Sequence, residues 1–288
     1  MIDVAIIGAG NLGTALGSAL SKKGYRIRAL SCQTLSSVRK SLQIIGEGRA
    51  LTDNMQTARE GKLIFICVPD SEIIKVVKEL AGKSLSWRGK YVLHCSGLHS
   101  AEVLNPLKDK GAFTASLHPV QSFSQRKGGL EQFEGIYFGL EGGDKALDLA
   151  QKIAADLGGY SIMIRGKDKA LYHAACSVAS NFLVIVLDVA VSLLKFIGFE
   201  EAQASEIVLP LVQGTLQNIK KFNIETSLTG PIIRGDKESV ETHLDALRKF
   251  PAYREIYRSL AIQALEIAKK KKLAPDKIKA LKSLLDRK

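Results

Sequence analysis

Residues 4–20, with the sequence VAIIGAGNLGTALGSAL, constrain the fold of this chain more than any other segment. An apolar run precedes Gly8, Gly10 and Gly13, and an alanine- and leucine-rich stretch follows them. In a strand–turn–helix unit these glycines allow a tight turn, the close approach of a pyrophosphate, and close packing of helix on strand. A plain glycine-rich connection would show the same spacing, but the position at the start of an alternating α/β pattern favours nucleotide binding. The predicted phosphate-binding residues are Gly8, Ala9, Gly10, Asn11, Leu12 and Gly13.

The second expected strand bears on the choice of nucleotide. NAD-binding folds place an acidic residue about 20 positions after the glycines, where it binds the ribose 2′-hydroxyl. Between Val4 and Gly46 the chain has no Asp or Glu. The strand instead runs into Ser31 and Cys32, with Arg39 following, and hydroxyls with a nearby cation suit a 2′-phosphate. We therefore predict NADP as the cofactor, although a solvated helix would also carry Arg39 on its surface.

Three further strand ends should meet at the ligand-binding edge of the sheet. Val68 and Pro69 end one strand, and we expect them beside the cofactor. Ser96 ends the next and serves either as a cofactor contact or as part of a simple turn. His118 and Gln121 follow a third strand, where they would orient a substrate unless His118 is satisfied locally.

The distribution of predicted strands divides the chain into two domains. The 288 residues, 46% of them hydrophobic, can bury sizeable cores. The α/β alternation extends to about residue 165, and long helical patterns interrupted near Gly198, Pro210, Pro231 and Pro251 follow it. We predict a Rossmann domain with a mostly parallel sheet at residues 1–165 and an all-helical domain at 166–288. The expected strands are residues 4–7, 26–30, 63–68, 91–95, 114–117, 137–140 and 161–164.

A polar stripe lies at the start of the expected helical domain. Its members recur every four residues, so on a helix they drift only about 120° around the axis. They also extend along about 18 Å of that axis, too far for all of them to touch one reacting centre. A surface helix would show such a stripe, but the adjacent alanines and the apolar turns that follow favour a cleft. The stripe consists of Lys169, His173, Ser177 and Asn181.

The longest apolar run, residues 182–199, contains Asp188 and Lys195. It is shorter than the roughly 20 uninterrupted apolar residues of a bilayer span. We expect a buried helix, with a subunit interface as one source of burial and no membrane partner. The net charge of +12 is spread along the chain apart from Lys269–Lys272 and the C-terminal residues. Because no basic patch alternates with aromatic residues, nucleic acid is not an expected partner.

The four cysteines show neither CxxC nor Cys/His metal spacing. We therefore expect reduced thiols and no metal site. Because the first expected strand begins almost at Met1, a leader peptide is not expected and the predicted location is the cytoplasm.

Six segments carry a family resemblance: VAIIGAGNLGTAL, CVPD, HCSG, SLHPVQSF, DKALYHAACSVASNF and LTGPIIRGD. In this order they resemble the Rossmann-like NADP oxidoreductases that carry a C-terminal domain of unknown function, DUF2520. The chain is more distantly similar to pyrroline-5-carboxylate reductase, ketopantoate reductase and the 6-phosphogluconate dehydrogenase group. The resemblance implies a helical domain of the 6-phosphogluconate dehydrogenase C-terminal type and a homodimer. Related β-hydroxyacid dehydrogenases use a lysine and an asparagine four residues apart, whereas here Lys169 is followed by His173 at that spacing.

These features predict NADPH-dependent reduction of a small, anionic C=O or C=N substrate. The protein must orient the acceptor and supply a proton. Lys169 or His173 is the candidate donor, with His118, Ser177 and Asn181 orienting the substrate. A ketopantoate-type 2-oxo acid reductase and a pyrroline-carboxylate-type imine reductase both remain open, as does an NADP-binding redox sensor without turnover.

Overall fold

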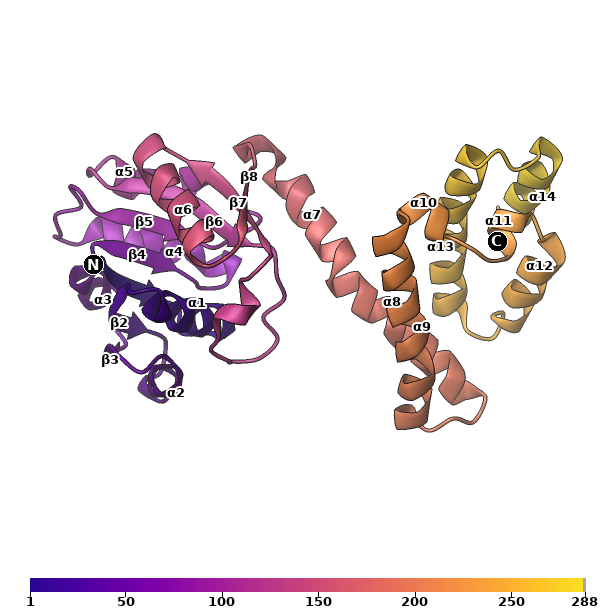
Figure 1. The fold of residues 1–288 in the computed structure, drawn as a ribbon, viewed down its shortest axis with the longest axis horizontal. Helices are drawn as coiled ribbons and strands as arrows, with labels where there is room; N and C mark the ends of the chain where they lie inside the picture. Colours follow the sequence, from indigo (N-terminus) through magenta and orange to yellow (C-terminus); the bar gives the residue numbers. More distant parts are fainter. Residues whose placement is uncertain (287–288) are drawn as a thin grey trace. The chain divides into compact units, whose positions relative to one another are not determined.

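The computed structural model describes residues 1–286 as two compact units, Met1–Phe182 and Leu183–Lys288. The first unit contains all eight strands found in the described residues, and the second is helical (Figure 1). The change from sheet to helix falls between Met163 and Lys169, close to the expected boundary after residue 165. The division by compactness falls later, after Phe182.

The first unit is a twisted sheet in the order β3-β2-β1-β4-β5-β6-β7-β8. Every neighbouring pair is parallel except β6 with β7, which is antiparallel. This confirms the predicted α/β class with a mostly parallel sheet. The strands are β1 (Asp3–Ile7), β2 (Arg26–Ser31), β3 (Arg49–Leu51), β4 (Leu63–Ile66), β5 (Tyr91–His94), β6 (Phe113–Pro119), β7 (Tyr137–Gly142) and β8 (Tyr160–Met163).

The strand β3 was not expected from the sequence. It has three residues, Arg49–Leu51, of which Arg49 is exposed and the other two are partly buried. An edge strand this short shows no alternation of apolar and polar residues long enough to detect. It pairs only with β2, so its absence from the prediction leaves the central strands and the binding edge unchanged.

Alternating side chains of the strands form two separate hydrophobic cores. Val4 and Ile6 of β1 face one core, whereas Ala5 and Ile7 face the other. The first core is covered by α1, α2 and α6 and the second by α3, α4 and α5. The bounds are α1 (Asn11–Lys22), α2 (Leu35–Ile45), α3 (Asn54–Glu60), α4 (Asp70–Gly82), α5 (Asn105–Lys108) and α6 (Asp144–Asp156).

The order of the strands fixes where a ligand can bind. The chain leaves β1 toward β2 and β3, and then returns to place β4 on the other side of β1. Such a reversal opens a crevice at the carboxyl ends of the two central strands. Here those ends lead into Gly8 and Cys67, and the adjacent β5 leads into Cys95 and Ser96.

The helix α7 (Lys169–Ala179) closes the first unit, and α8 (Asn181–Phe196) begins at its end. The second unit has its own core, formed by residues such as Val240, Leu265 and Leu281. Pro210 lies inside α9, so the predicted break there is wrong, whereas those near Gly198, Pro231 and Pro251 are confirmed. The remaining helices are α9 (Glu201–Lys221), α10 (Ile224–Ser227), α11 (Pro231–Arg234), α12 (Lys237–Ala246), α13 (Pro251–Lys270) and α14 (Pro275–Leu285).

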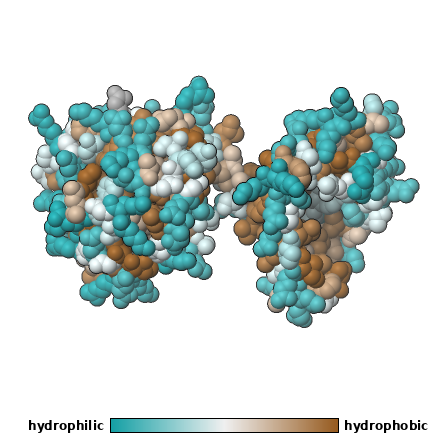
Figure 2. Space-filling model, viewed as in Figure 1, coloured by the Kyte–Doolittle hydropathy of each residue, from teal (hydrophilic) through white to brown (hydrophobic). Residues whose placement is uncertain are grey.

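Within a single chain, residues 182–199 do not form the buried helix that was expected, whereas their burial at a subunit interface stays a prediction. No residue of α8 is buried, and Val184 and Ile197 are 63% and 73% exposed. The stretch Gly166–Phe196 is helical and, by length and composition alone, apolar enough to cross a membrane. Figure 2 shows apolar residues gathered on the surface of the helical unit. Hydrophobicity on every side indicated burial, but the chain by itself does not provide enough neighbours to cover the helix.

Candidate functional site

The turn after β1 has the geometry that its glycines predicted. Gly8 has φ +107°, a conformation that side-chain-bearing residues rarely adopt. A methyl group there would also lie 2.6 Å from the carbonyl oxygen of Cys67. The backbone N–H groups of Gly8 and Ala9 both donate to the carbonyl oxygen of Ser31, at 2.9 and 3.1 Å. The turn is therefore held between the ends of β2 and β4.

The start of α1 can accept a phosphate. A methyl group on Gly13 would overlap the carbonyl oxygen of Gly8, whereas one on Gly10 would meet nothing within 4 Å. Gly10 is the N-cap residue, no side chain caps the helix, and its first turn has no acidic residue. The first N–H groups are thus free of side-chain partners, and their dipole favours an anion. These features fit a dinucleotide pyrophosphate.

The residues at and after the end of β2 offer fewer free groups for a 2′-phosphate than the sequence predicted. Ser31 is fully buried, and its hydroxyl donates to Asn54 Oδ1 at 2.9 Å. Thr34 caps α2 by accepting from the backbone N–H of Ser37 at 3.3 Å. Cys32 is partly buried, and Arg39 is exposed on α2. Ser31 contacts the glycine turn through its carbonyl, so the predicted contact between its hydroxyl and the 2′-phosphate requires a group that is already engaged.

Two cysteines meet at the ends of β4 and β5. The sulfur atoms of Cys67 and Cys95 lie 3.6 Å apart, and all four cysteines of the chain are free. The hydrogen bond to Cys95, together with burial, raises the pKa of the Cys67 thiol well above its usual value. Next to Cys67, Val68 is partly buried and Pro69 is exposed as the N-cap residue of α4.

The turn after β5 is pinned by its own side chains. Burial lowers the pKa of His94 to about 3, so its ring is neutral at pH 7. Its Nδ1 accepts from the Ser96 backbone N–H at 3.2 Å, which leaves Nε2 to donate to the carbonyl of Ser100. The Ser96 hydroxyl accepts from the N–H groups of Leu98 and His99 at 3.0 Å. The Ser96 side chain is therefore part of the turn, and its contact with the cofactor stays a prediction.

Lys169 lies beneath this turn. Its side chain is 1% exposed, and Nζ donates to the Ser96 carbonyl at 3.1 Å and to the Ser116 hydroxyl. Burial lowers the pKa of Lys169 to about 8, against the opposing attraction of the Glu141 and Asp70 carboxylates. The ammonium is thus anchored inside the first unit.

A pocket of about 600 Å³ opens between the end of β6 and α7, entirely within the first unit. It brings together five of the residues that the sequence analysis considered at this edge: His118, Gln121, His173, Ser177 and Asn181. We call it the polar pocket. Lys169, the remaining member of the predicted stripe, is not part of its lining. The other lining residues are Val120, Ser122, Tyr172, Ala175, Cys176, Ala179 and Ser180.

Two histidines stand at the inner end of the polar pocket. Their ring centres are 6.2 Å apart, and a methyl group on Gly97 would lie 2.8 Å from both rings. Gly97 therefore lets the turn after β5 approach His118 and His173. Burial, reinforced by the Lys169 and His173 charges, lowers the pKa of His118 to about 4. The ring of His118 is neutral at pH 7.

Tyr172 is a pocket residue that the sequence analysis missed. Its hydroxyl lies 2.8 Å from His118 Nδ1, and the two rings meet edge to face. Burial and the neighbouring Cys176 raise the pKa of Tyr172, so its hydroxyl stays protonated. In sequence the tyrosine precedes His173, which gives no sign that its side chain reaches a residue 54 positions away. Only the packing of α7 beside β6 shows it.

The polar pocket offers groups for hydrogen bonding and proton transfer. Within residues 1–286, no group of three or more His, Cys, Asp or Glu side chains has an arrangement that could hold a metal ion. The polar pocket instead provides imidazole, hydroxyl, amide and thiol groups. Such groups can orient a polar ligand and move a proton, which is the protein's part in a hydride transfer.

Comparison with family models divides the chain in two. Residues 1–119 match the model of a Rossmann-like domain, and residues 136–264 match that of a domain of unknown function, DUF2520. The first match contains the glycine turn and the ends of β4, β5 and β6. The second contains α7 and most of the helical unit. No curated protein matches the chain.

Solved structures share the fold over nearly the whole chain. A candidate NADP oxidoreductase from Bacteroides fragilis is 24% identical, with TM-score 0.78, and the match covers 92% of this chain and 98% of that one. A Thermotoga maritima protein is 28% identical, with TM-score 0.72 and coverage of 94% and 100%.

Pyrroline carboxylate reductase from Plasmodium falciparum, solved with NADP bound, is 14% identical, with TM-score 0.58 and coverage of 97% and 98%. At this level of identity the likeness concerns the fold. The fold, the glycine turn and the two family matches together identify the chain as a Rossmann-like domain joined to a DUF2520 domain.

Proposed function

We propose that this protein is an NAD(P)-dependent oxidoreductase, that its cofactor is NADP, and that it reduces a small C=O or C=N substrate. The observation that carries the proposal is the contact of Gly97 with His118 and His173. It joins the turn after β5, at the cofactor edge of the sheet, to the inner end of the polar pocket. Bound NADPH would supply the hydride, and the chain's own residues would hold the acceptor and provide the proton.

The preference for NADP rests on charge. No acidic residue occurs between Val4 and Gly46, so the chain lacks the usual partner of a free ribose 2′-hydroxyl. The same carboxylate would repel a 2′-phosphate, and its absence removes that penalty. The net charge of +12 further favours the more highly charged dinucleotide.

Within the polar pocket, we assign His173 as the proton donor. Its side chain is partly buried and lines the pocket next to Gly97. His118 is neutral and hydrogen-bonded to Tyr172, which suits it to orient the acceptor atom. Lys169, the other predicted donor, bonds to Ser96 and Ser116 instead, so in this proposal it holds the turn in place.

The outer part of the pocket would receive the rest of the substrate. Gln121, Ser177 and Asn181 offer neutral hydrogen-bond donors, and no residue of the lining is an acid. A carboxylate on the substrate would therefore meet donors without like-charge repulsion. This supports the small anionic substrate expected from the sequence. The lining does not distinguish a 2-oxo acid from a cyclic imine.

The test begins with binding and continues with turnover. NADPH and NADH are titrated into the protein and followed by nicotinamide fluorescence, and then 2-oxo acids and cyclic imines are added to the complex. We expect selective binding of NADPH and its oxidation by one acceptor class. His173→Ala should abolish that oxidation while leaving NADPH affinity unchanged. Leu171→Ala, at an exposed position on the same helix, is the matched control.

Binding without turnover across the panel would favour the redox sensor over the reductase. Binding of neither dinucleotide would contradict the whole proposal.

We further propose that the protein is a homodimer formed through the helical unit. An apolar pocket of about 760 Å³ lies between α8, α9 and the residues around the start of α13. Its lining includes Leu194, Ile197 and Leu211, with the latter two 73% exposed. Exposed patches of this kind mark interaction sites. A second copy of the chain carries equally uncovered helices.

Sedimentation equilibrium should give twice the chain mass of 31.3 kDa. A monomer, or recovery of the protein with lipid vesicles, would contradict the dimer. We propose a cytoplasmic location because the spacing of the four cysteines is not typical of a disulfide framework, which fits a protein of a reducing compartment. Cell fractionation tests this.

A further inference from the structure

The segment between β6 and the turn that begins at Leu130, residues 120–129, crosses from the polar pocket to the first two helices. We call it the strap. At its start, Gln121 and Ser122 line the polar pocket. In its middle, the Phe123 carbonyl accepts a hydrogen bond of 2.8 Å from Asn11 Nδ2, the first residue of α1. The strap is therefore fixed to the end of α1 that we expect to face the pyrophosphate.

The far end of the strap lies flat against α1 and α2. A methyl group on Gly128 would come within 2.6 Å of both the Ser18 hydroxyl and the side chain of Ile44. Ser18 belongs to α1 and Ile44 to α2. Such close contact brings the neighbouring strap residues within side-chain reach of both helices.

From this position the side chain of Arg126 contacts α2. Its Nη1 donates to the Ser37 carbonyl at 3.1 Å, and its Nη2 donates to the Ser37 hydroxyl at 3.0 Å. Both partners are neutral. None of the ion pairs found within residues 1–286 includes Arg126. The guanidinium is thus ordered and partly buried, and its charge has no carboxylate partner.

The location of this charge bears on cofactor choice. Ser37 is the third residue of α2, the helix that follows β2. In dinucleotide-binding folds the group that recognises the ribose 2′ position stands just beyond this strand, and an arginine there accommodates a 2′-phosphate. The hydroxyls of Ser31 and Thr34 are engaged elsewhere, and Arg39 is exposed on the same helix. Of the cations near β2, Arg126 is the one held in place by two hydrogen bonds.

We propose that Arg126 binds the 2′-phosphate of NADP and thereby sets the selectivity for NADP over NAD. This inference rests on the proposed dinucleotide binding and names a residue of the strap, 87 positions beyond the sequence candidate Arg39. The guanidinium exchanges two neutral partners on Ser37 for phosphate oxygens. Bonds to an ionised phosphate are roughly twice as strong as neutral ones, and the planar fork of arginine matches them. The exchange is therefore favourable only for the phosphorylated cofactor.

The experiment compares ligands that differ only in the 2′-phosphate. Dissociation constants for NADPH and NADH come from nicotinamide fluorescence, and those for 2′,5′-ADP and 5′-AMP from calorimetry. In Arg126→Ala we expect NADPH and 2′,5′-ADP to bind about 10-fold or more weakly, because a charge-assisted pair is lost. The constants for NADH and 5′-AMP should change less than about twofold, since neither ligand presents the group that Arg126 recognises.

Four further variants control for indirect effects. Lys127→Ala removes an exposed charge from the adjacent strap residue, and Arg39→Ala removes the sequence candidate; both should retain selectivity. Ser37→Ala removes one partner of the guanidinium and should also retain it. Arg126→Lys keeps the charge without the fork, and we expect it to recover part of the NADPH affinity. Melting temperatures identify any variant that fails to fold.

Two results would overturn the inference while leaving dinucleotide binding intact. One is an equal loss of NADPH and NADH affinity in Arg126→Ala, which would make Arg126 a support of the strap alone. The other is unchanged NADPH affinity in that variant, with or without a loss in Arg39→Ala. Wild-type protein that binds none of the four ligands would overturn the proposed function together with this inference.

Discussion

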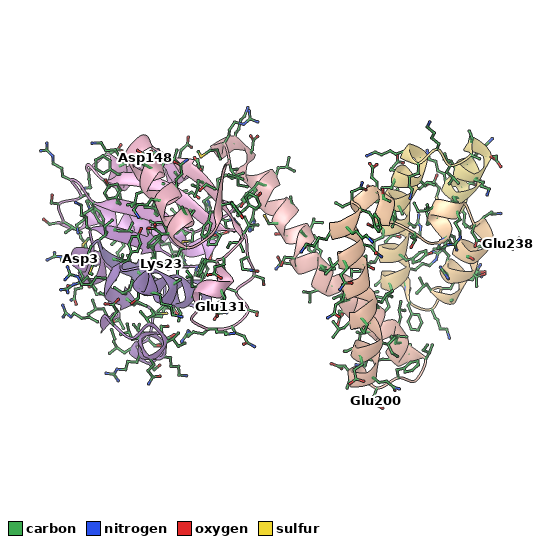
Figure 3. All side chains as sticks on the ribbon, viewed as in Figure 1. Asp3, Lys23, Glu131, Asp148, Glu200 and Glu238 are labelled. Carbon is green, nitrogen blue, oxygen red and sulfur yellow. The ribbon has the colours of Figure 1, made fainter. Side chains whose placement is uncertain are left out.

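The ligand edge of the sheet and the α8–α9 surface differ in how completely the chain covers them by itself. At the sheet edge, buried polar groups such as His94, Ser31 and Lys169 have hydrogen-bond partners within the first unit. Along α8, by contrast, no residue is buried, and apolar side chains face outward. Figure 3 shows Glu200 at the turn between α8 and α9. The first region is complete in one chain, whereas the second needs another surface.

The largest effect is expected from a substitution in the glycine turn, which belongs to the region that the chain completes by itself. We expect Gly10→Ala to weaken NADPH binding about 100-fold, or roughly 2.8 kcal/mol, because its methyl group would occupy the place of the pyrophosphate. Its melting temperature should not change, since that methyl group meets nothing in the protein. Gly13→Ala is the contrasting variant, because its methyl group overlaps Gly8 and should lower the melting temperature. Equal melting losses in both variants would contradict this division of roles.

The next test concerns the incompleteness of the helical unit. Leu211→Glu places a charge in the apolar pocket and should raise the dimer dissociation constant roughly 50-fold, or about 2.3 kcal/mol. Analytical ultracentrifugation over a range of concentrations measures this constant. Leu171→Glu is the matched control, because Leu171 is 78% exposed in the first unit. If both variants dissociate alike, the interface does not include the apolar pocket.

A third test uses pH to examine the buried polar groups of the first unit. The pKa values of His94 and His118 are lowered to about 3 and about 4, below the unfolded value near 6.5. Between pH 7 and 5 the unfolded chain therefore binds more protons than the folded chain. The free energy of unfolding should fall over this range by about 1.9 kcal/mol for each histidine. Lys169, with its pKa lowered to about 8, stays protonated in both states over this range and adds no slope.

Urea unfolding can follow this loss through the fluorescence of Trp87, which is buried in the first unit. His94→Gln should remove about half of the histidine contribution. His243→Gln, in the second unit, should leave unchanged the slope of the free energy of unfolding against pH. A slope that is the same in His94→Gln and the wild type would show that His94 is protonated or exposed in the folded state.

The smallest expected effect concerns the orientation of His118. In Tyr172→Phe one neutral hydrogen bond is lost, which should lower turnover about fivefold, or roughly 1 kcal/mol. Nitrogen NMR of the histidine rings supplies a second readout. We expect Nε2 to carry the proton of His118 in the wild type and a mixture of tautomers in the variant. Tyr137→Phe, at an exposed position on β7, is the control, and an unchanged tautomer in Tyr172→Phe would exclude the positioning role.

Much of the first unit could be predicted because its signals are local. The glycines at positions 8, 10 and 13 act within one turn, and His173, Ser177 and Asn181, spaced four residues apart, line one pocket. The local sequence pattern alone therefore identifies these residues. The partners that only the structure identifies come from distant segments: Tyr172 lies 54 positions from His118, and Arg126 lies 89 from Ser37. No periodicity in one segment indicates which residue of another it contacts.

The sequence by itself determined the alternation of strands and helices, the dinucleotide turn and the change to helix near residue 165. Those features depend on side-chain period and backbone freedom, which are properties of neighbouring residues. The tertiary structure decided that Lys169 is enclosed beneath the turn after β5, that Ser31 is engaged with Asn54, and that α8 is uncovered. Burial depends on which segments pack together, so an apolar helix or a lone lysine has the same sequence pattern whether it is covered or exposed.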